Sequence, residues 1–153
     1  MYLLLKLLHV LGVIAFLGNI TTGLFWHRHA WRMGDPRVLA HTMSGIIRAD
    51  RLFTTPGVLV ILLSGIAAAH IGGIPILKTG WVLWTLVLFF GSGAIFGMRV
   101  VPLQRQMLAV AAAQDSFDAQ RYARLARQWQ TWGAIAVLLP LVGVVLMVLK
   151  PVH

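Results

Sequence analysis

Four stretches of the chain contain no Asp, Glu, Lys or Arg, and each is about as long as a membrane crossing. They cover residues 7–26, 52–77, 79–98 and 128–149. A helix that crosses a bilayer needs about 20 consecutive, mainly apolar residues, because its backbone polar groups must find their partners inside the segment. The sequence therefore predicts four membrane-spanning helices, at about residues 3–26, 53–73, 80–101 and 130–150.

Composition supports a membrane protein and limits the possible partners. The 153 residues are 59% hydrophobic and 11% charged, whereas soluble domains carry about 25% charged residues. A chain of this length suits one domain, residues 1–153, and the lack of cysteine rules out disulfides and thiolate metal sites. A net charge of +9 would suggest nucleic acid for a soluble protein. Here the positive residues form two blocks beside apolar runs, so we expect membrane lipids, and no nucleic acid, as partners.

The positive charge also predicts an orientation. All ten Arg residues lie between charge-free stretches, five between the first and second stretches and five between the third and fourth. Residues 72–80, by contrast, contain one charged residue, Lys78. The positive-inside rule places both Arg-rich connections in the cytoplasm and both termini outside a bacterial inner membrane. The first span could be mistaken for a signal peptide, but Lys6 is its only early charge and no small-residue cleavage site follows, so we expect a retained helix.

The Arg-rich connections are themselves predicted to be helical, so that each pair of spans forms one long hairpin. In the first connection, Gly34, Asp35 and Pro36 combine a helix-ending glycine, an N-capping aspartate and a proline suited to the first helical position. In the second, Asp115 and Asp118 have the spacing of a capping box. The hairpins would therefore turn at residues 34–35 and 114–115, and residues 27–52 and 102–129 would form cytoplasmic helical extensions.

Both extensions carry apolar residues at helical spacing. These are Leu39, Met43, Ile46 and Ile47 in the first extension, and Tyr122, Leu125, Trp129 and Trp132 in and just beyond the second. Helices of about 33 residues would be roughly 50 Å long, which exceeds a hydrocarbon core of about 30 Å. The sequence therefore predicts an all-α fold, an integral membrane four-helix bundle made of two long helical hairpins.

Two histidines, His9 and His70, lie within or at the end of predicted spans. An ionisable side chain inside a bilayer is costly and is a functional candidate by default. Since the first two spans run antiparallel, both imidazoles are expected at similar depth near the outer face, where they could hold a haem iron axially. The alternatives are a hydrogen bond across helices for His9 and an interfacial side chain that reaches water for His70.

The helical face that carries His9 continues through small and polar residues, namely Gly12, Phe16, Asn19 and Gly23. Glycine allows close approach between helices, and Asn can donate across them. For this stripe as a whole, helix packing is the favoured interpretation. We also count Asn19, its polar member, among the candidate cofactor-binding residues.

Three further histidines, His27, His29 and His41, lie in the basic first connection. Residues two apart on a helix point to different sides, so a metal site at His27 and His29 is the weaker interpretation. A solvated surface near anionic lipid headgroups is favoured for all three. Lys150, at the end of the fourth span, is most simply an interfacial anchor.

The third span carries small residues on one face. Gly93 and Gly97 have GxxxG spacing, which predicts close helix contact within the chain or between copies, and so a homo-oligomer as one outcome. Pro56 and Pro140 are expected to bend the second and fourth spans. A bend can open a cavity in which a flat cofactor or a quinone would fit.

Short motifs in the same order along the chain resemble the HemJ-type protoporphyrinogen IX oxidases and the related CopD-like membrane proteins. They are the run Lys6-Leu-Leu-His9-Val-Leu-Gly, the run Arg51-Leu-Phe-Thr-Thr-Pro56-Gly57, and the pairs Ser64-Gly65, Gly80-Trp81 and Lys150-Pro151. The chain looks closer still to an uncharacterised bacterial family of predicted integral membrane proteins.

This resemblance implies a small four-helix membrane protein that binds haem b through the first-helix histidine, here His9. HemJ-type proteins oxidise protoporphyrinogen IX late in haem synthesis. Arg51 and Lys150 match motif positions and join Asn19 and His70 as candidate cofactor-site residues. The third helix of HemJ-type proteins carries a Lys soon after the Gly-Trp pair and a His further along, whereas this chain has Val82-Leu-Trp-Thr and Gly91-Ser-Gly there. The resemblance therefore implies haem binding more directly than oxidase activity.

Two functions remain open at this point. The first is a haem-b membrane redox protein that passes electrons from a porphyrinogen or quinol to a quinone or oxygen, with the protein supplying ligation, orientation and a dry site. The alternative is a cofactor-free protein that is transporter-like, copper-handling or a scaffold. The six Met residues do not cluster along the sequence, so they favour copper only weakly.

Overall fold

The computed structural model describes residues 1–151 and consists of four long helical rods. The first rod is α1 (Tyr2–Met33) and the fourth is α6 (Ala119–Leu149). The second comprises α2 (Pro36–Ala49), the π-helical turn η1 (Asp50–Thr54) and α3 (Thr55–Ile71). The third comprises α4 (Gly80–Ile95), the π-helical turn η2 (Phe96–Val100) and α5 (Val101–Ala112). The chain is 89% helical, with no strand in the described part, which confirms the all-α membrane bundle.

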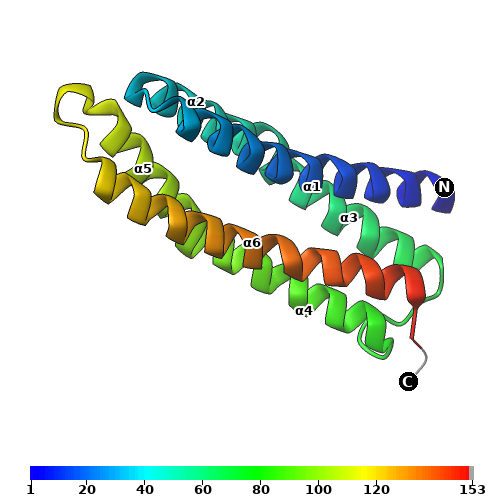
Figure 1. Ribbon diagram of the computed structural model, residues 1–153. Helices are drawn as coiled ribbons and strands as arrows, with labels where there is room; N and C mark the ends of the chain where they lie inside the picture. The colour runs from blue at the N-terminus through cyan, green and yellow to red at the C-terminus, as the bar shows by residue number, and fades with distance from the viewer. Residues whose placement is uncertain (152–153) are drawn as a thin grey trace.

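The rods pair as two hairpins whose turns lie at one end of the molecule, and both chain termini lie at the other end (Figure 1). They contain 32, 36, 33 and 31 residues, and all four are long and apolar enough to cross a membrane. At 1.5 Å per residue each rod is about 50 Å long. The predicted length of the hairpins is therefore confirmed.

The first hairpin turn forms as its sequence predicts. Gly34 ends α1 in the left-handed conformation, with φ 69°, and donates its N–H to the carbonyl of Trp31. Asp35 caps α2, since its Oδ1 accepts a hydrogen bond from the backbone N–H of Arg37 at 2.8 Å, and Pro36 occupies the first helical position. Glycine tolerates positive φ without steric cost, so these three residues are sufficient to reverse the chain.

The second hairpin turn differs from the prediction. A short 3₁₀ helix, η3 (Gln114–Ser116), follows α5, and Asp115 lies inside it instead of capping a helix. The cap of α6 is Asp118, whose Oδ1 accepts from the N–H of Arg121 at 2.8 Å. The predicted capping box beginning at Asp115 is therefore wrong, because the side chain that reaches the free N–H groups of the helix is that of Asp118.

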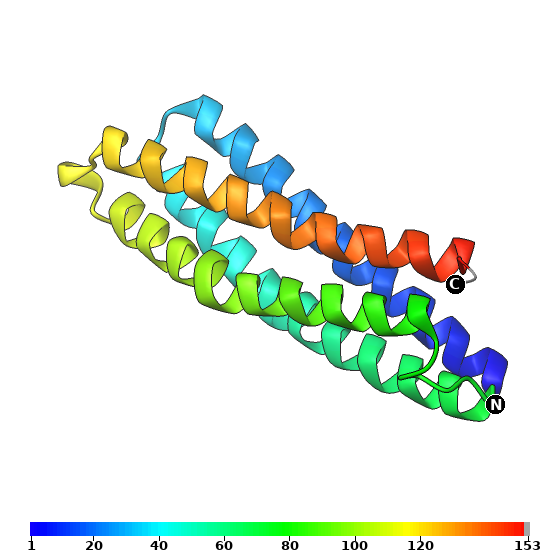
Figure 2. The same ribbon diagram turned by 90° about the horizontal axis from the view of Figure 1, so that it is seen from below.

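Both π-helical turns begin six residues before a proline. Asp50 precedes Pro56 and Phe96 precedes Pro102 by this spacing. A proline inside a helix has no N–H to donate and its ring clashes with the carbonyl four residues earlier. In each turn the residue before the proline instead bonds five residues back, Thr55 to Asp50 and Val101 to Phe96. The rods thus continue through the turns (Figure 2), at the cost of a local widening that is frequent at functional sites.

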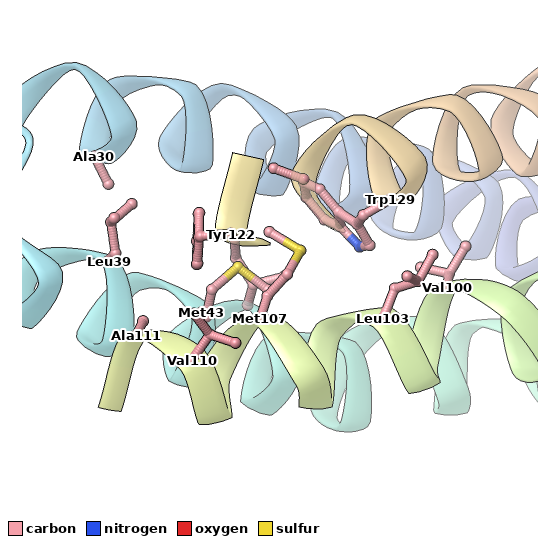
Figure 3. Close-up of a cluster of buried hydrophobic side chains, with 12 residues drawn as sticks. Ala30, Leu39, Met43, Val100, Leu103, Met107, Val110, Ala111, Tyr122 and Trp129 are labelled. Carbon is pink, nitrogen blue, oxygen red and sulfur yellow. The ribbon is translucent and has the colours of Figure 1, made fainter. Parts of the chain in front are cut away.

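Figure 3 shows the main cluster of buried hydrophobic side chains, which come from the helices on either side of the two hairpin turns. We call residues 27–52 and 102–129 the turn half, and residues 1–26, 53–101 and 130–151 the terminal half. Apart from Val100, every member of this cluster belongs to the turn half: Ala30, Leu39, Met43, Ile46, Leu103, Met107, Val110, Ala111, Tyr122, Ala126 and Trp129. Four further buried hydrophobic residues lie in the terminal half, namely Phe16, Ile61, Val82 and Ala136. The faces predicted from helical spacing in the two extensions are therefore the buried faces.

The terminal half packs mainly within each hairpin. In the first hairpin, a Cβ added to Gly12 would come within 3.0 Å of Ile61 Cγ1, and Gly57 lies against Phe16. In the second, Ser92 Oγ donates to the carbonyl of Ala136, 2.5 Å away. Small residues thus permit close helix contact, which confirms the packing interpretation of the stripe on the first helix. Between the hairpins, the Phe16 and Phe89 rings meet with centroids 6.1 Å apart.

Candidate functional site

His9 is held against α3 in a defined orientation. Its Nδ1 lies 2.8 Å from the backbone carbonyl oxygen of Ile61, and a carbonyl can only accept, so Nδ1 carries the hydrogen. The ring lies over Gly65, where an added Cβ would be 2.9 Å from Nδ1 and 3.0 Å from Cε1. In the neutral imidazole the lone pair is then on Nε2, which has no hydrogen-bond partner among the described residues.

His70 lies in the last turn of α3 and is exposed. The contacts of α1 with α3 set the register of the pair, because Tyr2 lies beside Gly72 and His9 lies over Gly65. His70 is five residues beyond Gly65, which is about 7.5 Å along the helix axis. The structure therefore does not bring the two imidazoles together, and the role of His70 as a second ligand stays a prediction.

The two cationic candidates lie on the surface. Arg51 is exposed on η1. Lys150 ends α6 with φ 45°, and its Nζ lies 5.7 Å from the centroid of the Trp81 ring. A lysine over an aromatic face at the end of an apolar helix is the arrangement of an interfacial anchor.

The structure contains a buried polar cluster that sequence reasoning found only in part. It joins Asn19 of α1, Asp50 and Thr54 of η1, and Gln104 of α5. Asp50 Oδ1 accepts from Asn19 Nδ2 and from Thr54 Oγ1, both at 3.0 Å, and its Oδ2 accepts from Gln104 Nε2 at 2.8 Å. Among the candidates from the sequence, Asn19 alone belongs to this cluster. The cluster ties both hairpins together at the level of the π turns.

A signal for Asp50 and Gln104 is present in the sequence. Asp50 follows Ile46 by four residues and so continues the buried face of α2, and Gln104 similarly lies between Leu103 and Met107 on the buried face of α5. A polar residue on an apolar helical face is more informative than one among other polar residues. Asp50 is 8% exposed and Gln104 is 2% exposed.

A cavity of about 330 Å³ opens beside this cluster. Asn19, Asp50 and Gln104 contribute to its wall, together with aromatic residues from three elements, namely Trp26, Phe96 and Trp129. The Trp129 side chain is buried, and its Nε1 has no acceptor among the described residues. This wall therefore offers a carboxylate and aromatic faces to whatever enters.

The prediction of a solvated surface is wrong for His27, whose side chain is buried with 1% of its area exposed. Its Nε2 lies 3.1 Å from the Tyr122 hydroxyl, and its ring packs against Trp129 with centroids 5.0 Å apart. Burial lowers the pKa of His27, in the predicted cytoplasmic extension, to about 4, so the imidazole is neutral at physiological pH. His29 and His41 are exposed, as expected.

Comparison with known proteins agrees with this membrane architecture. Residues 3–151 match the model of a family described as predicted integral membrane protein (DUF2269). The chain belongs to the DUF2269 family. The matched range includes both hairpins and the four residues of the Asp50 cluster. No curated protein and no solved structure matches the chain.

Membership of this family confirms two of the expectations. The chain is a multi-pass integral membrane protein, and its family is one of predicted integral membrane proteins. The family description names no ligand or reaction. Two sites in the structure bear on function: the oriented His9 and the Asp50 cavity.

Proposed function

We propose that this DUF2269 protein is a haem-b-binding redox protein of the bacterial inner membrane, with His9 as an axial ligand. The observation that carries the proposal is the hydrogen bond from His9 Nδ1 to the Ile61 carbonyl. Metal-ligating histidines almost always donate their other ring N–H to a carbonyl, a carboxylate or water, which fixes the tautomer and orients the ring. His9 has this arrangement and therefore fits the role of an axial ligand.

The absence of a side chain at Gly65 adds support. Any larger residue there would collide with the His9 ring, since even a Cβ would lie 2.9 Å from Nδ1. The resemblance to HemJ-type proteins includes both His9 and the Ser64-Gly65 pair. Bound haem would supply one-electron chemistry, and a porphyrinogen or quinol would be its reductant. The chain would contribute ligation by His9, orientation by α3 and apolar helices that exclude water.

The second axial position has two candidates at the same end of the bundle. His70 and Lys150 end α3 and α6, and α1 begins beside them (Figure 1). Lys150 would have to leave the Trp81 ring. His70 is already exposed and needs no partner to be displaced. We therefore propose His70 before Lys150.

We also propose that the turn half faces the cytoplasm and that both termini lie outside. Nine of the ten Arg residues lie in the turn half and the tenth, Arg99, lies in η2 next to it, whereas the connection between α3 and α4 has Lys78 as its single charge. The two turns lie at the same end of the bundle, so one orientation satisfies both. This is the distribution that positive-inside insertion produces.

A cofactor-free function is the alternative, and one observation favours it: a cavity opens at Asp50, and His9 is not among the residues that line it. A transporter-like protein would need such a cavity, with a charged residue in its wall, between the hairpins. Copper handling gains little, because Met43 and Met107 are fully buried in the core with apolar neighbours. On this alternative, His9 serves only to join α1 to α3.

Optical spectra of protein purified from haem-replete cells separate these functions. We expect one b-type haem per chain and a Soret band that sharpens and shifts on reduction. His9→Ala should remove it, whereas His29→Ala, an exposed histidine on the same helix, should not. His70→Ala should give a high-spin spectrum if His70 is the second ligand. A colourless, well-folded wild-type protein would rule out the redox proposal and leave the cofactor-free alternative.

A further inference from the structure

The Asp50 carboxylate has no positive partner in the described part of the chain. Its three hydrogen-bond donors are the neutral groups of Asn19, Thr54 and Gln104. The chain has 13 Lys and Arg residues, and none of them lines the cavity beside Asp50. A buried carboxylate is costly unless it is paired. In so cationic a protein, a cavity that contains an acid and excludes every Lys and Arg is selective for positive charge.

The rest of the cavity wall suits an organic cation better than a metal ion. Trp26, Phe96 and Trp129 supply aromatic faces, and such faces attract ammonium groups. Among the described residues no three His, Cys, Asp or Glu side chains gather as metal ligands. The volume of about 330 Å³ is in the range of small-molecule sites and far exceeds the needs of one bare ion.

The cavity opens to the surface on one side. The exposed residues Thr22, His41 and Gly45 lie at the rim, so a ligand can enter between α1 and α2.

We infer that this cavity binds a small organic cation, a primary to quaternary amine. Asp50 neutralises the charge of the ligand, and the aromatic side chains of the wall contact its alkylammonium group. Asn19, Thr54 and Gln104 position the Asp50 carboxylate. Asn19 is ten residues from His9, about 15 Å along α1, so this site is independent of the proposed haem site.

The test is calorimetric titration of the purified protein in lipid nanodiscs with choline and ethanolamine. The matched probe is 3,3-dimethyl-1-butanol, which has the shape of choline without its charge. We expect the ammonium ions to bind and the neutral alcohol to bind at least about tenfold more weakly. Equal binding of choline and the alcohol, or binding of neither ammonium ion, would overturn the inference. Binding of sodium ions, with no binding of choline or ethanolamine, would overturn it too.

Variants locate the site. Asp50→Asn preserves the shape of the side chain and should weaken choline binding by tenfold or more, whereas Asp115→Asn, at an exposed acid in η3, should leave it unchanged. Trp26→Ala removes an exposed aromatic wall without touching the polar cluster, so it keeps the test valid even if Asp50→Asn fails to fold. Trp26→Ala should weaken choline binding several-fold. Unchanged affinity in a folded Asp50→Asn or in Trp26→Ala would refute the site. The haem spectrum is measured on the same samples, so loss of one site is separable from loss of the other.

Discussion

The two halves of the bundle follow opposite packing rules. In the turn half, Leu39, Met43, Met107 and Tyr122 are almost completely buried, as in a water-soluble protein. In the terminal half, large aliphatic side chains point outward, for example Leu63 at 69% and Val148 at 73% exposure. All exposed Leu, Ile and Val residues except Leu52 belong to that half. One chain thus folds for two solvents, water at the Arg-rich end and lipid at the other, since lipid tails are as apolar as leucine.

The polar cluster lies where the two halves meet. Asp50 and Gln104 come from the turn half, and Asn19 and Thr54 from the terminal half. Both π turns lie near this level, because Asp50 begins η1 and its donor Gln104 lies four residues beyond the end of η2. The boundary between a core that excludes water and helices that face lipid is therefore also the place where the backbone is irregular and a cavity opens.

The largest effect we expect is a difference in the free energy of unfolding between two leucine variants, one in each half. Leu39→Ala removes a fully buried side chain and should lower the free energy of unfolding by about 2–5 kcal/mol. Leu63→Ala alters a side chain that faces outward and should change it by less than about 0.5 kcal/mol in a lipid bilayer. Thermal unfolding in nanodiscs, followed by circular dichroism, measures both. Equal losses would mean that the terminal half has a core of its own.

A second effect concerns the pH dependence of the turn half. The pKa of His27 is about 4 in the folded protein and about 6.5 in an unfolded chain, so the unfolded state binds the proton more readily. The stability from neutral His27 is fully present above pH 6.5 and is lost as the pH falls towards 4, by roughly 3 kcal/mol at most. His27→Phe should flatten that part of the stability curve, whereas His41→Phe, at an exposed position, should not. An unchanged slope in His27→Phe would show that the buried ring is not the cause.

The smallest effect on stability is expected at the GxxxG pair of α4. Gly93 and Gly97 are exposed, and a Cβ at either would meet nothing within 4 Å, so they do not pack inside the chain. Replacing both with Leu should leave the unfolding temperature unchanged and reduce the oligomer mass, if copies associate there as the GxxxG spacing predicts. Gly143→Leu is the contrasting control, because a Cβ there lies 3.0 Å from Thr85 Cγ2 and the variant should be destabilised. An oligomer of unchanged mass would remove α4 as the contact.

Sequence patterns predicted the features that depend on residues close together in the chain. The hairpin turn at Gly34, the helix lengths and the buried face of α2 follow from caps and helical spacing, and all are confirmed. Contacts between distant segments were not predictable in the same way. His27 is buried because Tyr122, 95 residues away, folds over it. Asp50 gains Gln104 as a donor only when the hairpins pair, although its place on an apolar face was a signal that could have been used.

The division of the molecule between water and lipid is tested most directly by labelling single cysteines, since the natural chain has none. Three positions are informative: Lys78 in the connection of α3 to α4, Ala113 in the second hairpin turn, and Leu63 on the exposed face of α3. With a maleimide that cannot cross membranes, applied to intact spheroplasts, Lys78→Cys should react at once and Ala113→Cys only after the membrane is opened. Leu63→Cys should stay unlabelled in both conditions because lipid covers it. Immediate labelling of Ala113→Cys, or labelling of Leu63→Cys in opened membranes as fast as that of Ala113→Cys, would contradict the account.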